Sequence, residues 1–218
     1  MIEILVKGGS MMIPLVICSV VAVAVLIDRI WAFHANSKID TRALRAELMT
    51  LLAENKTADA KTLCAGTPSP ISAVLLVGVQ AYERILEVDG SPEAIRSIMG
   101  KAMEDYSSHA LSAVEKRLYI LSMVGNAAPL FGMTGTVTGM IASFDALRQQ
   151  GMEAGAVAAG ISEALITTAA GLIIALAAVI PYNIMMTSSD NIALEIEEAA
   201  SELVDFLALR AEKQRAGK

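Results

Sequence analysis

Aromatic residues are scarce in this sequence: Phe, Trp and Tyr together make up 4% of its 218 residues. Charged residues are scarce too, at 18%, whereas soluble domains carry about 25%. Apolar residues nevertheless reach 55%, so Ala, Val, Ile, Leu and Met carry the hydrophobicity. This composition excludes a wholly disordered chain and argues against a simple soluble globule. The net charge of −6 gives no support to nucleic-acid binding.

The residue patterns of common enzymes are also missing. There is no P-loop, no G-x-S-x-G and no H-E-x-x-H, so we expect a protein that is not an enzyme. His34 and His109 have no second ligand nearby in the sequence, so we expect no metal site and no cofactor. Cys18 falls in an apolar stretch and Cys64 in a polar segment, so no disulfide is expected.

What the sequence does contain is three long hydrophobic stretches. The first has no charge from residue 11 to 27, and Trp31 and Phe33 follow as an interfacial anchor. A cleaved signal peptide is the alternative, but its apolar region would be too long and no A-x-A site follows. Residues 118–144 and 154–189 form the second and third stretches, each long enough to cross a bilayer. We therefore predict an all-α integral membrane protein with three transmembrane helices.

Lys and Arg concentrate between the first two stretches and after the third. The N-terminal tip has only Lys7, and the tip of the hairpin between the last two stretches has only Arg148. The positive-inside rule places both tips outside, in what we expect to be a bacterial inner membrane. The predicted organisation is an outer N-terminus (1–10), a first transmembrane helix (11–33), a cytoplasmic helical segment (34–117), a second transmembrane helix (118–144), an outer hairpin tip (145–153), a third transmembrane helix (154–189) and a cytoplasmic helical tail (190–218).

Local signals divide the polar segment into helices. Asp40 or Thr41 can cap a helix that runs toward Lys61. The prolines at 68 and 70 break the chain, and a helix is expected over 71–88.

A further helix is expected to run directly into the second stretch. Asp89-Gly90 ends the preceding helix, Ser91-Pro92 starts the next one, and no breaker follows before Gly125. The third stretch is expected to continue past the membrane as an amphipathic helix, which packs inside the polar bundle, against another subunit, or both. Its apolar residues are Ile192, Ile196, Ala199, Leu203 and Phe206.

Glycines and threonines interleave in the second stretch. Gly135 and Gly139 form a GxxxG pair, which allows close approach of another helix. The threonine hydroxyls either bond to carbonyls one turn back or face a polar cavity. The complete set is Gly132, Thr134, Gly135, Thr136, Thr138 and Gly139.

Glu163 is the only charged residue of the third stretch. A carboxylate inside a membrane span costs about 2.5–3.5 kcal/mol on insertion scales. It is either an interfacial glutamate or part of a polar path. Thr167 follows one turn along the same stripe, and Thr168 lies about 140° round the helix from Glu163. One carboxylate does not make a relay across a membrane, so the chain needs copies of itself, a partner, or both.

At these positions the sequence resembles the MotA/TolQ/ExbB proton-channel family, most closely its three-span ExbB and TolQ branch. The motifs that carry the resemblance are Ala128-Pro129, Gly135-Thr136-Val137-x-Gly139-Met140, Gly160-Ile161-x-Glu163-Ala164-Leu165-x-x-Thr168-Ala169-x-Gly171-Leu172 and Ile180-Pro181-Tyr182-Asn183. The motifs occur in the order and at the spacings of the family, and the resemblance in organisation covers nearly the whole chain. Gly171 joins the packing glycines, and Pro129 and Pro181 are expected to kink their helices.

The resemblance implies a pentamer whose second and third spans surround a pore. The pore would hold a dimer of a single-span partner similar to ExbD or TolR, which bears the ion-carrying Asp. Ion flow would drive rotation, and the output would act on a TonB-like or TolA-like protein for outer-membrane import. By the same resemblance Thr136, Glu163 and Thr168 belong to the ion pathway, and Thr134 and Thr167 are added to it here as extra hydroxyls.

The translocated ion and the load stay open. Thr134, Thr138, Ser162 and Thr167 replace residues that are apolar or aromatic in many family members, so these four hydroxyls favour Na⁺ as an alternative to H⁺. Alternative loads are TolQ-like envelope maintenance, adhesion export or gliding. A membrane scaffold without ion flux is an alternative of another class. A secondary transporter fits poorly, because it would have more spans and an inverted repeat.

Overall fold

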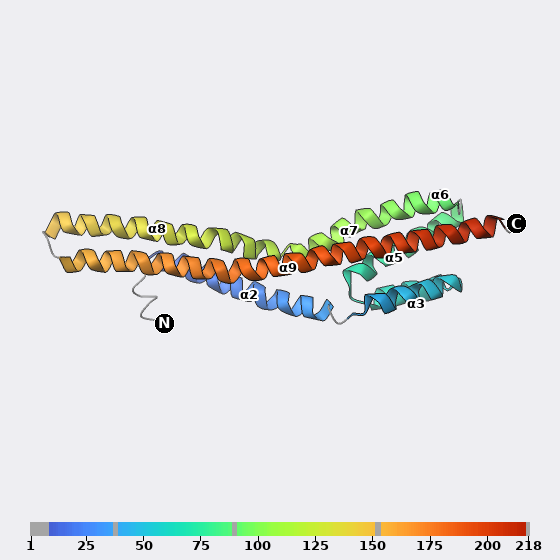
Figure 1. Cartoon of the computed structure of the whole chain (residues 1–218), viewed down its shortest axis with the longest axis horizontal. Coiled ribbons are helices and arrows are strands. Elements are labelled where there is room, and N and C mark those ends of the chain that lie inside the picture. The colour runs from blue at the N-terminus through green and yellow to red at the C-terminus, as the bar shows by residue number, and fades with distance from the viewer. Residues whose placement is uncertain (1–8, 37–38, 89–90, 151–153, 217–218) are drawn as a thin grey trace. The chain divides into compact units, whose positions relative to one another are not determined.

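The computed structural model describes residues 9–36, 39–88, 91–150 and 154–216. Within these ranges every regular element is helical (Figure 1). Three helices are long and apolar enough to cross a membrane, and they include Met12–His34, Leu118–Asp145 and Val157–Ala216. The predicted all-α fold with three membrane-spanning helices is therefore confirmed.

The chain divides into two compact units. The first, called here the apolar unit, comprises residues 1–30 and 117–185. The second, the polar unit, comprises residues 31–116 and 186–218. Each unit has its own packed interior, so each is described by itself.

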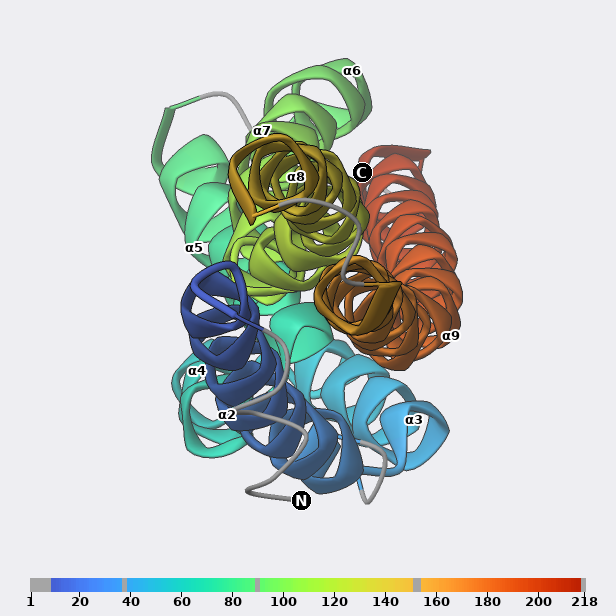
Figure 2. The ribbon, with the colours of Figure 1, turned by 90° about the vertical axis from the view of Figure 1, so that its left-hand side faces the viewer.

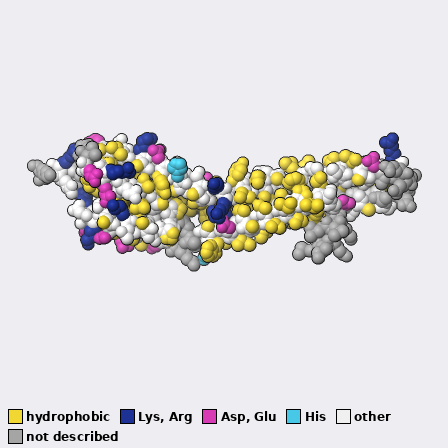
Figure 3. Space-filling model, turned by 180° about the vertical axis from the view of Figure 1, so that it is seen from behind, with side chains coloured by type: hydrophobic (Ala, Val, Ile, Leu, Met, Phe, Trp, Pro, Cys, Tyr) yellow, Lys and Arg dark blue, Asp and Glu magenta, His cyan; other side chains and the backbone are white. Residues whose placement is uncertain are grey.

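The apolar unit contains most of α2 (Met12–Asn36), all of α8 (Leu118–Gln150) and the first part of α9 (Ala154–Ala216). In it α8 and α9 lie side by side along their lengths (Figures 1 and 2). Met12 and Leu15 at the start of α2 pack with Ala128 of α8 and Ala175 of α9. Large apolar side chains point outward from all three helices, and Figure 3 shows them covering this unit's visible face. Such a surface suits hydrocarbon rather than water.

The polar unit is built from shorter helices. They are α3 (Thr41–Ala53), α4 (Thr57–Gly66), α5 (Pro70–Val88), α6 (Pro92–Ala94), a π-helical turn η1 (Ile95–Met99), α7 (Gly100–Glu115) and the end of α9. The Asp40 carboxylate accepts hydrogen bonds from the amides of Arg42 and Ala43, and the Ser91 hydroxyl accepts one from Ala94. These contacts confirm the predicted caps and satisfy amides that have no partner inside the helix.

The core of the polar unit is aliphatic and contains methionine. Leu48, Leu75 and Met103, from α3, α5 and α7, are fully buried in it. From α9 come Ile192, Ile196, Ala199 and Leu203, with Phe206 partly buried against them. The predicted apolar stripe of α9 thus packs inside the bundle, and a subunit contact by the same stripe stays a prediction.

One predicted helix of the polar unit is shorter than expected. The helix that starts after Asp40 ends at Ala53 instead of continuing toward Lys61. Asn55 adopts a left-handed backbone conformation with φ 61°, and α4 starts afresh at Thr57. Asparagine tolerates this conformation better than most residues, which explains why the chain turns there.

A second correction concerns the helix that was expected to run into the second span. It is interrupted at Lys116 and Arg117, between α7 and α8. The amide of Ile120 donates to the carbonyl of Arg117 over 3.3 Å, a tight turn without glycine or proline. The break after Gly66 and the helix from Pro70 are as predicted, whereas Asp89-Gly90 lies outside the described residues.

Candidate ion pathway

The centre of the candidate site is a pair of threonines on facing helices. Thr136 of α8 and Thr168 of α9 bring their hydroxyl oxygens into direct contact. The carbonyl oxygen of Gly132 lies 3.1 Å from the Thr136 hydroxyl and 2.9 Å from the Thr168 hydroxyl. Two hydroxyls supply two protons for three short contacts, so one contact is always without a proton. Both side chains are half-buried, which keeps one side of this cluster open.

Glycines make this close approach possible. A Cβ atom on Gly132 would lie 3.1 Å from the Cα of Thr168, and one on Gly171 would lie 2.6 Å from the carbonyl oxygen of Ala128. Both obstacles are backbone atoms, which cannot rotate away. Alanine at either position would therefore push α8 and α9 apart.

The same seam continues along the helices through Gly135 and Gly139. A Cβ atom on Gly135 would meet the methyl group of Thr167 at 2.6 Å. One on Gly139 would lie 3.0 Å from the Cβ of Ala164. All four predicted packing glycines thus face the other helix of the hairpin. This arrangement accounts for the interleaved pattern, because alternate residues in it point to different sides of α8.

Thr167 lies in this seam rather than beside the threonine pair. Its side chain is only 1% exposed, and its hydroxyl donates to the carbonyl of Glu163 over 2.9 Å. It therefore contributes to the helix crossing, and any part in ion transfer stays a prediction.

Thr134 and Thr138 lie on a different face of α8. Both are exposed, and their hydroxyls donate to the carbonyls of Leu130 and Thr134 over 2.8 and 3.0 Å. The bond to a carbonyl one turn back, one of the two interpretations from the sequence, is present for Thr134, Thr136 and Thr138 alike. The structure brings Thr136 and Thr168 together, and it does not bring Thr134 or Thr138 to them.

Glu163 lies apart from the threonine pair, with its side chain exposed. One carboxylate oxygen lies directly against Gly9, so a Cβ atom there would collide with it. Gly9 has a φ of +67°, a conformation that favours glycine. The turn before α2 therefore packs on the carboxylate.

A model of the MotA/TolQ/ExbB proton channel family matches residues 67–198, more than half of the chain. The chain belongs to the MotA/TolQ/ExbB proton channel family. The matched region contains Thr136, Glu163 and Thr168, the residues that carried the resemblance. The chain is accordingly a membrane protein of a proton-channel family.

Individual relatives point to two branches of this family. The putative biopolymer transport protein ExbB-like 1 of Synechocystis is 29% identical over 83% of this chain and 68% of its own length. The biopolymer transport protein ExbB of Salmonella typhimurium is 28% identical over 93% of this chain and 81% of its own. The Tol-Pal system protein TolQ of Pseudomonas aeruginosa is 36% identical, but over 53% of this chain and 51% of TolQ. The two ExbB-named relatives match over larger shares of the compared chains, whereas TolQ matches at higher identity. The resemblance to the ExbB and TolQ branch is therefore confirmed.

Two prolines lie inside the helices of this family member. Pro129 is in α8 and Pro181 is in α9, and each helix continues on both sides of its proline. Proline has no amide proton, so each leaves one carbonyl a turn earlier without its usual helical donor. The kinks expected there stay predictions.

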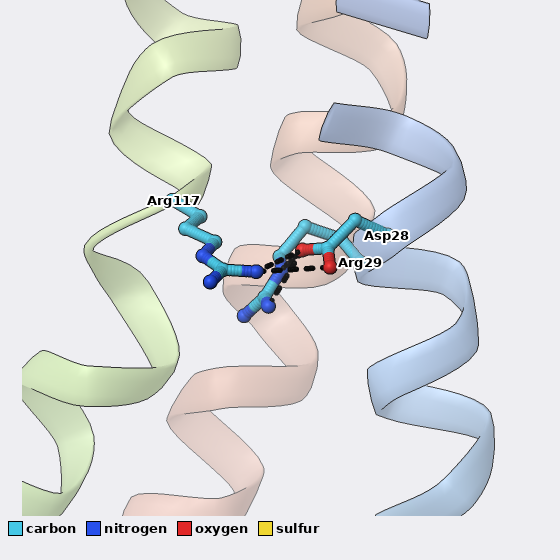
Figure 4. Close-up of polar contacts among 3 residues, drawn as sticks. All are labelled: Asp28, Arg29 and Arg117. Carbon is cyan, nitrogen blue, oxygen red and sulfur yellow. Dashed lines mark hydrogen bonds and ion pairs between the residues drawn. The ribbon is translucent and has the colours of Figure 1, made fainter. Parts of the chain in front are cut away.

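An ion cluster that the sequence did not predict lies in the apolar unit of this channel-family chain. The Asp28 carboxylate of α2 accepts hydrogen bonds from Arg117 at 2.9 Å to both oxygens and from Arg29 at 2.9 Å (Figure 4). Arg117 thus ties the beginning of α8 to α2. Charges at the ends of apolar stretches are a general signal for such pairs, but the pattern does not say which residues meet.

Gly9 is the other residue that the sequence reasoning missed. Its signal was a glycine pair immediately before the first apolar stretch, at Gly8 and Gly9. Glycine pairs are common in turns, so the pair alone did not indicate a contact with Glu163.

Among the described residues, no three His, Cys, Asp or Glu side chains gather in a way that could hold a metal ion.

Proposed function

We propose that this chain is the ion-channel subunit of an inner-membrane motor that uses the proton motive force to energise a TonB-like system for outer-membrane import. The observation that carries this proposal is the hydroxyl pair of Thr136 and Thr168 at the Gly132 carbonyl, within the apolar unit. Polar side chains inside a membrane span raise the free energy of insertion unless they are hydrogen-bonded, and they often mark a transport pathway. The family supports the transport role.

The threonine cluster has the chemistry that ion transfer near an apolar wall needs. Its oxygens can accept a hydrogen bond from a proton donor or contact a cation, and they add no charge of their own. A carboxylate on a partner helix that releases and takes up an ion must be hydrogen-bonded in a medium of low dielectric constant. The pair can supply that bond, and Glu163 attracts cations near the turn that precedes α2.

The proposed assembly follows the family resemblance. The chain forms a pentamer in the membrane, around a dimer of an ExbD-like or TolR-like single-span protein, and its output acts on a TonB-like or TolA-like protein. Its N-terminus is periplasmic and its C-terminus cytoplasmic, as the distribution of Lys and Arg supports. The complex holds no cofactor and is not an enzyme; H⁺ is the translocated ion.

Removal of the two hydroxyls tests the proposal. Thr136→Val and Thr168→Val keep the shape of the side chains, and together they should reduce proton flux at least tenfold in liposomes that contain the chain with its single-span partner. A pH-sensitive dye inside the liposomes measures the flux. Thr134→Val is the matched control, since its hydroxyl is exposed on another face of α8, and it should leave most of the flux. Unchanged flux in the double variant would contradict the proposed role of the two hydroxyls, and an absence of flux in the parent complex would favour a scaffold without ion flow.

Two finer alternatives have their own tests. The additional hydroxyls at Thr134, Thr138, Ser162 and Thr167 favour Na⁺ as the coupled ion, and replacing Na⁺ by K⁺ at fixed pH should then stop the motor. The TolQ relative favours a Tol-type load. Copurification of the chain with a TonB-like or a TolA-like protein would distinguish the two loads.

A further inference from the structure

A groove runs between α7 and α9 in the polar unit, outside the apolar spans. Its volume is about 490 Å³, and its floor is apolar where Met103 of α7 meets Ile196 and Val204 of α9. A groove of this kind between two helices suits the side chains of a third helix.

The rim of the groove is acidic. Glu104 stands on the α7 side, and Glu197 and Asp205 stand on the α9 side. All three are exposed, and no lysine or arginine is among the described residues that line the groove. No ion pair within the described parts of the chain includes any of the three. Carboxylates of one sign around an apolar floor attract a cationic, amphipathic ligand.

The opposite flank of α9 shows which kind of helix fits such a surface. There Arg45 of α3 places its guanidinium 3.2 Å from the Glu198 carboxylate and 3.3 Å from the Glu202 carboxylate. One and two turns along α3 from Arg45, Leu48 and Leu52 are buried in the core beside α9. An arginine that is followed by leucines at helical spacing therefore matches the acidic and apolar chemistry of α9.

We propose that the groove between α7 and α9 binds an amphipathic helix of a partner protein, with leucines on one face and arginine or lysine at its flanks. Charge complementarity supports this occupant. A second copy of the chain is the rival occupant, but the helix with the matching pattern, α3, already has its leucines buried inside its own chain. This docking surface is separate from the threonine pair, and it does not depend on the ion pathway.

A binding assay on the full-length chain tests the proposal. The chain is placed in phosphatidylcholine nanodiscs, and a labelled synthetic helical peptide of leucine and arginine is titrated by fluorescence anisotropy. We expect at least tenfold tighter binding than for a scrambled peptide of the same composition. Empty nanodiscs give the background of peptide binding to lipid.

Variants with equal changes in net charge locate the contact. Glu104→Gln, Glu197→Gln and Asp205→Asn together should raise the Kd at least tenfold. Substitutions at three exposed carboxylates away from the groove should change the Kd less than twofold: Glu47→Gln, Glu54→Gln and Glu87→Gln. Equal losses in both triple variants would overturn the proposal, because binding would then be general charge attraction.

A variant that fills the groove tests the apolar floor without a change in charge. Ala200 lines the groove and is partly exposed, so Ala200→Trp should abolish peptide binding while the helical content stays unchanged. Retention of binding, or equal binding of the scrambled peptide, would overturn the proposal. A third outcome would also overturn the proposal: the parent chain does not bind the peptide, and the triple variant at Glu104, Glu197 and Asp205 changes its oligomer mass. The groove would then be an interface between copies of the chain.

Discussion

The two units of this chain pack their helices by opposite means. In the apolar unit, α8 and α9 meet through glycines, and the backbone of one helix nearly touches the other at Gly171 and Ala128. In the polar unit the helices are held apart by large side chains such as Leu203 and Met103, which fill the space between them. The difference follows from the surroundings. Lipid offers no hydrophobic drive for association, so close contact and hydrogen bonds must hold the helices together, whereas water drives large apolar side chains into a core.

Truncation of a core side chain in the polar unit should have the largest effect on stability. Leu203→Ala removes a fully buried side chain and should lower the free energy of unfolding by about 2–5 kcal/mol, because it leaves a cavity. Circular dichroism of the full chain during SDS titration measures this change. Leu209→Ala on the same helix is the control, since Leu209 is exposed. Equal losses in both variants would show that α9 does not pack as described.

In the apolar unit an added methyl group should destabilise, which is the reverse of its usual effect in a helix. Gly171→Ala should cost about 1–3 kcal/mol, because its Cβ would press on a backbone carbonyl. Gly155→Ala is the control in the first turn of the same helix, where its Cβ meets nothing within 4 Å, so it should change the stability by less than about 0.5 kcal/mol. The same SDS titration gives both values. Equal losses at the two glycines would contradict the close seam at Gly171.

A smaller, local effect is expected at the turn before α2. Gly9→Ala puts a Cβ in a left-handed conformation at a cost of about 1–2 kcal/mol, and the flexible Glu163 carboxylate is the group that can move aside. The rate of Glu163 modification by a hydrophobic carbodiimide should therefore change severalfold, as mass spectrometry of the modified peptide can show.

Gly155→Ala serves again as the control for this measurement. It should leave the modification rate of Glu163 unchanged, because nothing lies near its Cβ position. An unchanged rate in Gly9→Ala as well would contradict the packing of the turn on the carboxylate.

The smallest effect concerns an ion pair at the surface of the polar unit. The Lys61 ammonium donates to the Glu83 carboxylate over 2.8 Å and lowers the pKa of that carboxyl. A lowered pKa stabilises the fold above the ordinary glutamate range, and the contribution is lost as the pH falls through the folded-state pKa. Lys61→Met should cost roughly 0.2–1 kcal/mol at pH 7, since both side chains are partly exposed.

The pH dependence is the check on this last prediction. The difference in stability between Lys61→Met and the parent chain should shrink on acidification, when Glu83 is protonated in both. A difference that is constant with pH would show that Lys61 acts through packing of its stem and not through its charge.

Local and periodic features were predictable from the sequence. Long apolar runs give three spans because hydrocarbon must be crossed, and Asp40 and Ser91 cap helices because their side chains reach amides two or three residues ahead. The family resemblance assigned Thr136 and Thr168 to one ion pathway, but it did not predict that both hydroxyls share the Gly132 carbonyl.

Contacts between distant residues, and turns without a breaker, were not predictable. Arg117 meets Asp28 across 89 residues, and Gly9 meets Glu163 across most of the chain between its first and third apolar stretches. Nothing in either local sequence specifies the other member of the pair. The turn at Lys116 likewise has no glycine or proline, so only the tertiary arrangement marks it.

The three oxygens at Gly132, Thr136 and Thr168 share two protons, and this has a consequence for motion. Rotation of one hydroxyl about its C–O bond moves the unfilled contact from one edge of the triangle to another, with every heavy atom in place. The local dipole can therefore reverse on the picosecond-to-nanosecond scale of side-chain motion, far faster than helices move. The heavy atoms of this cluster can therefore stay in place while the direction of its hydroxyl dipoles changes.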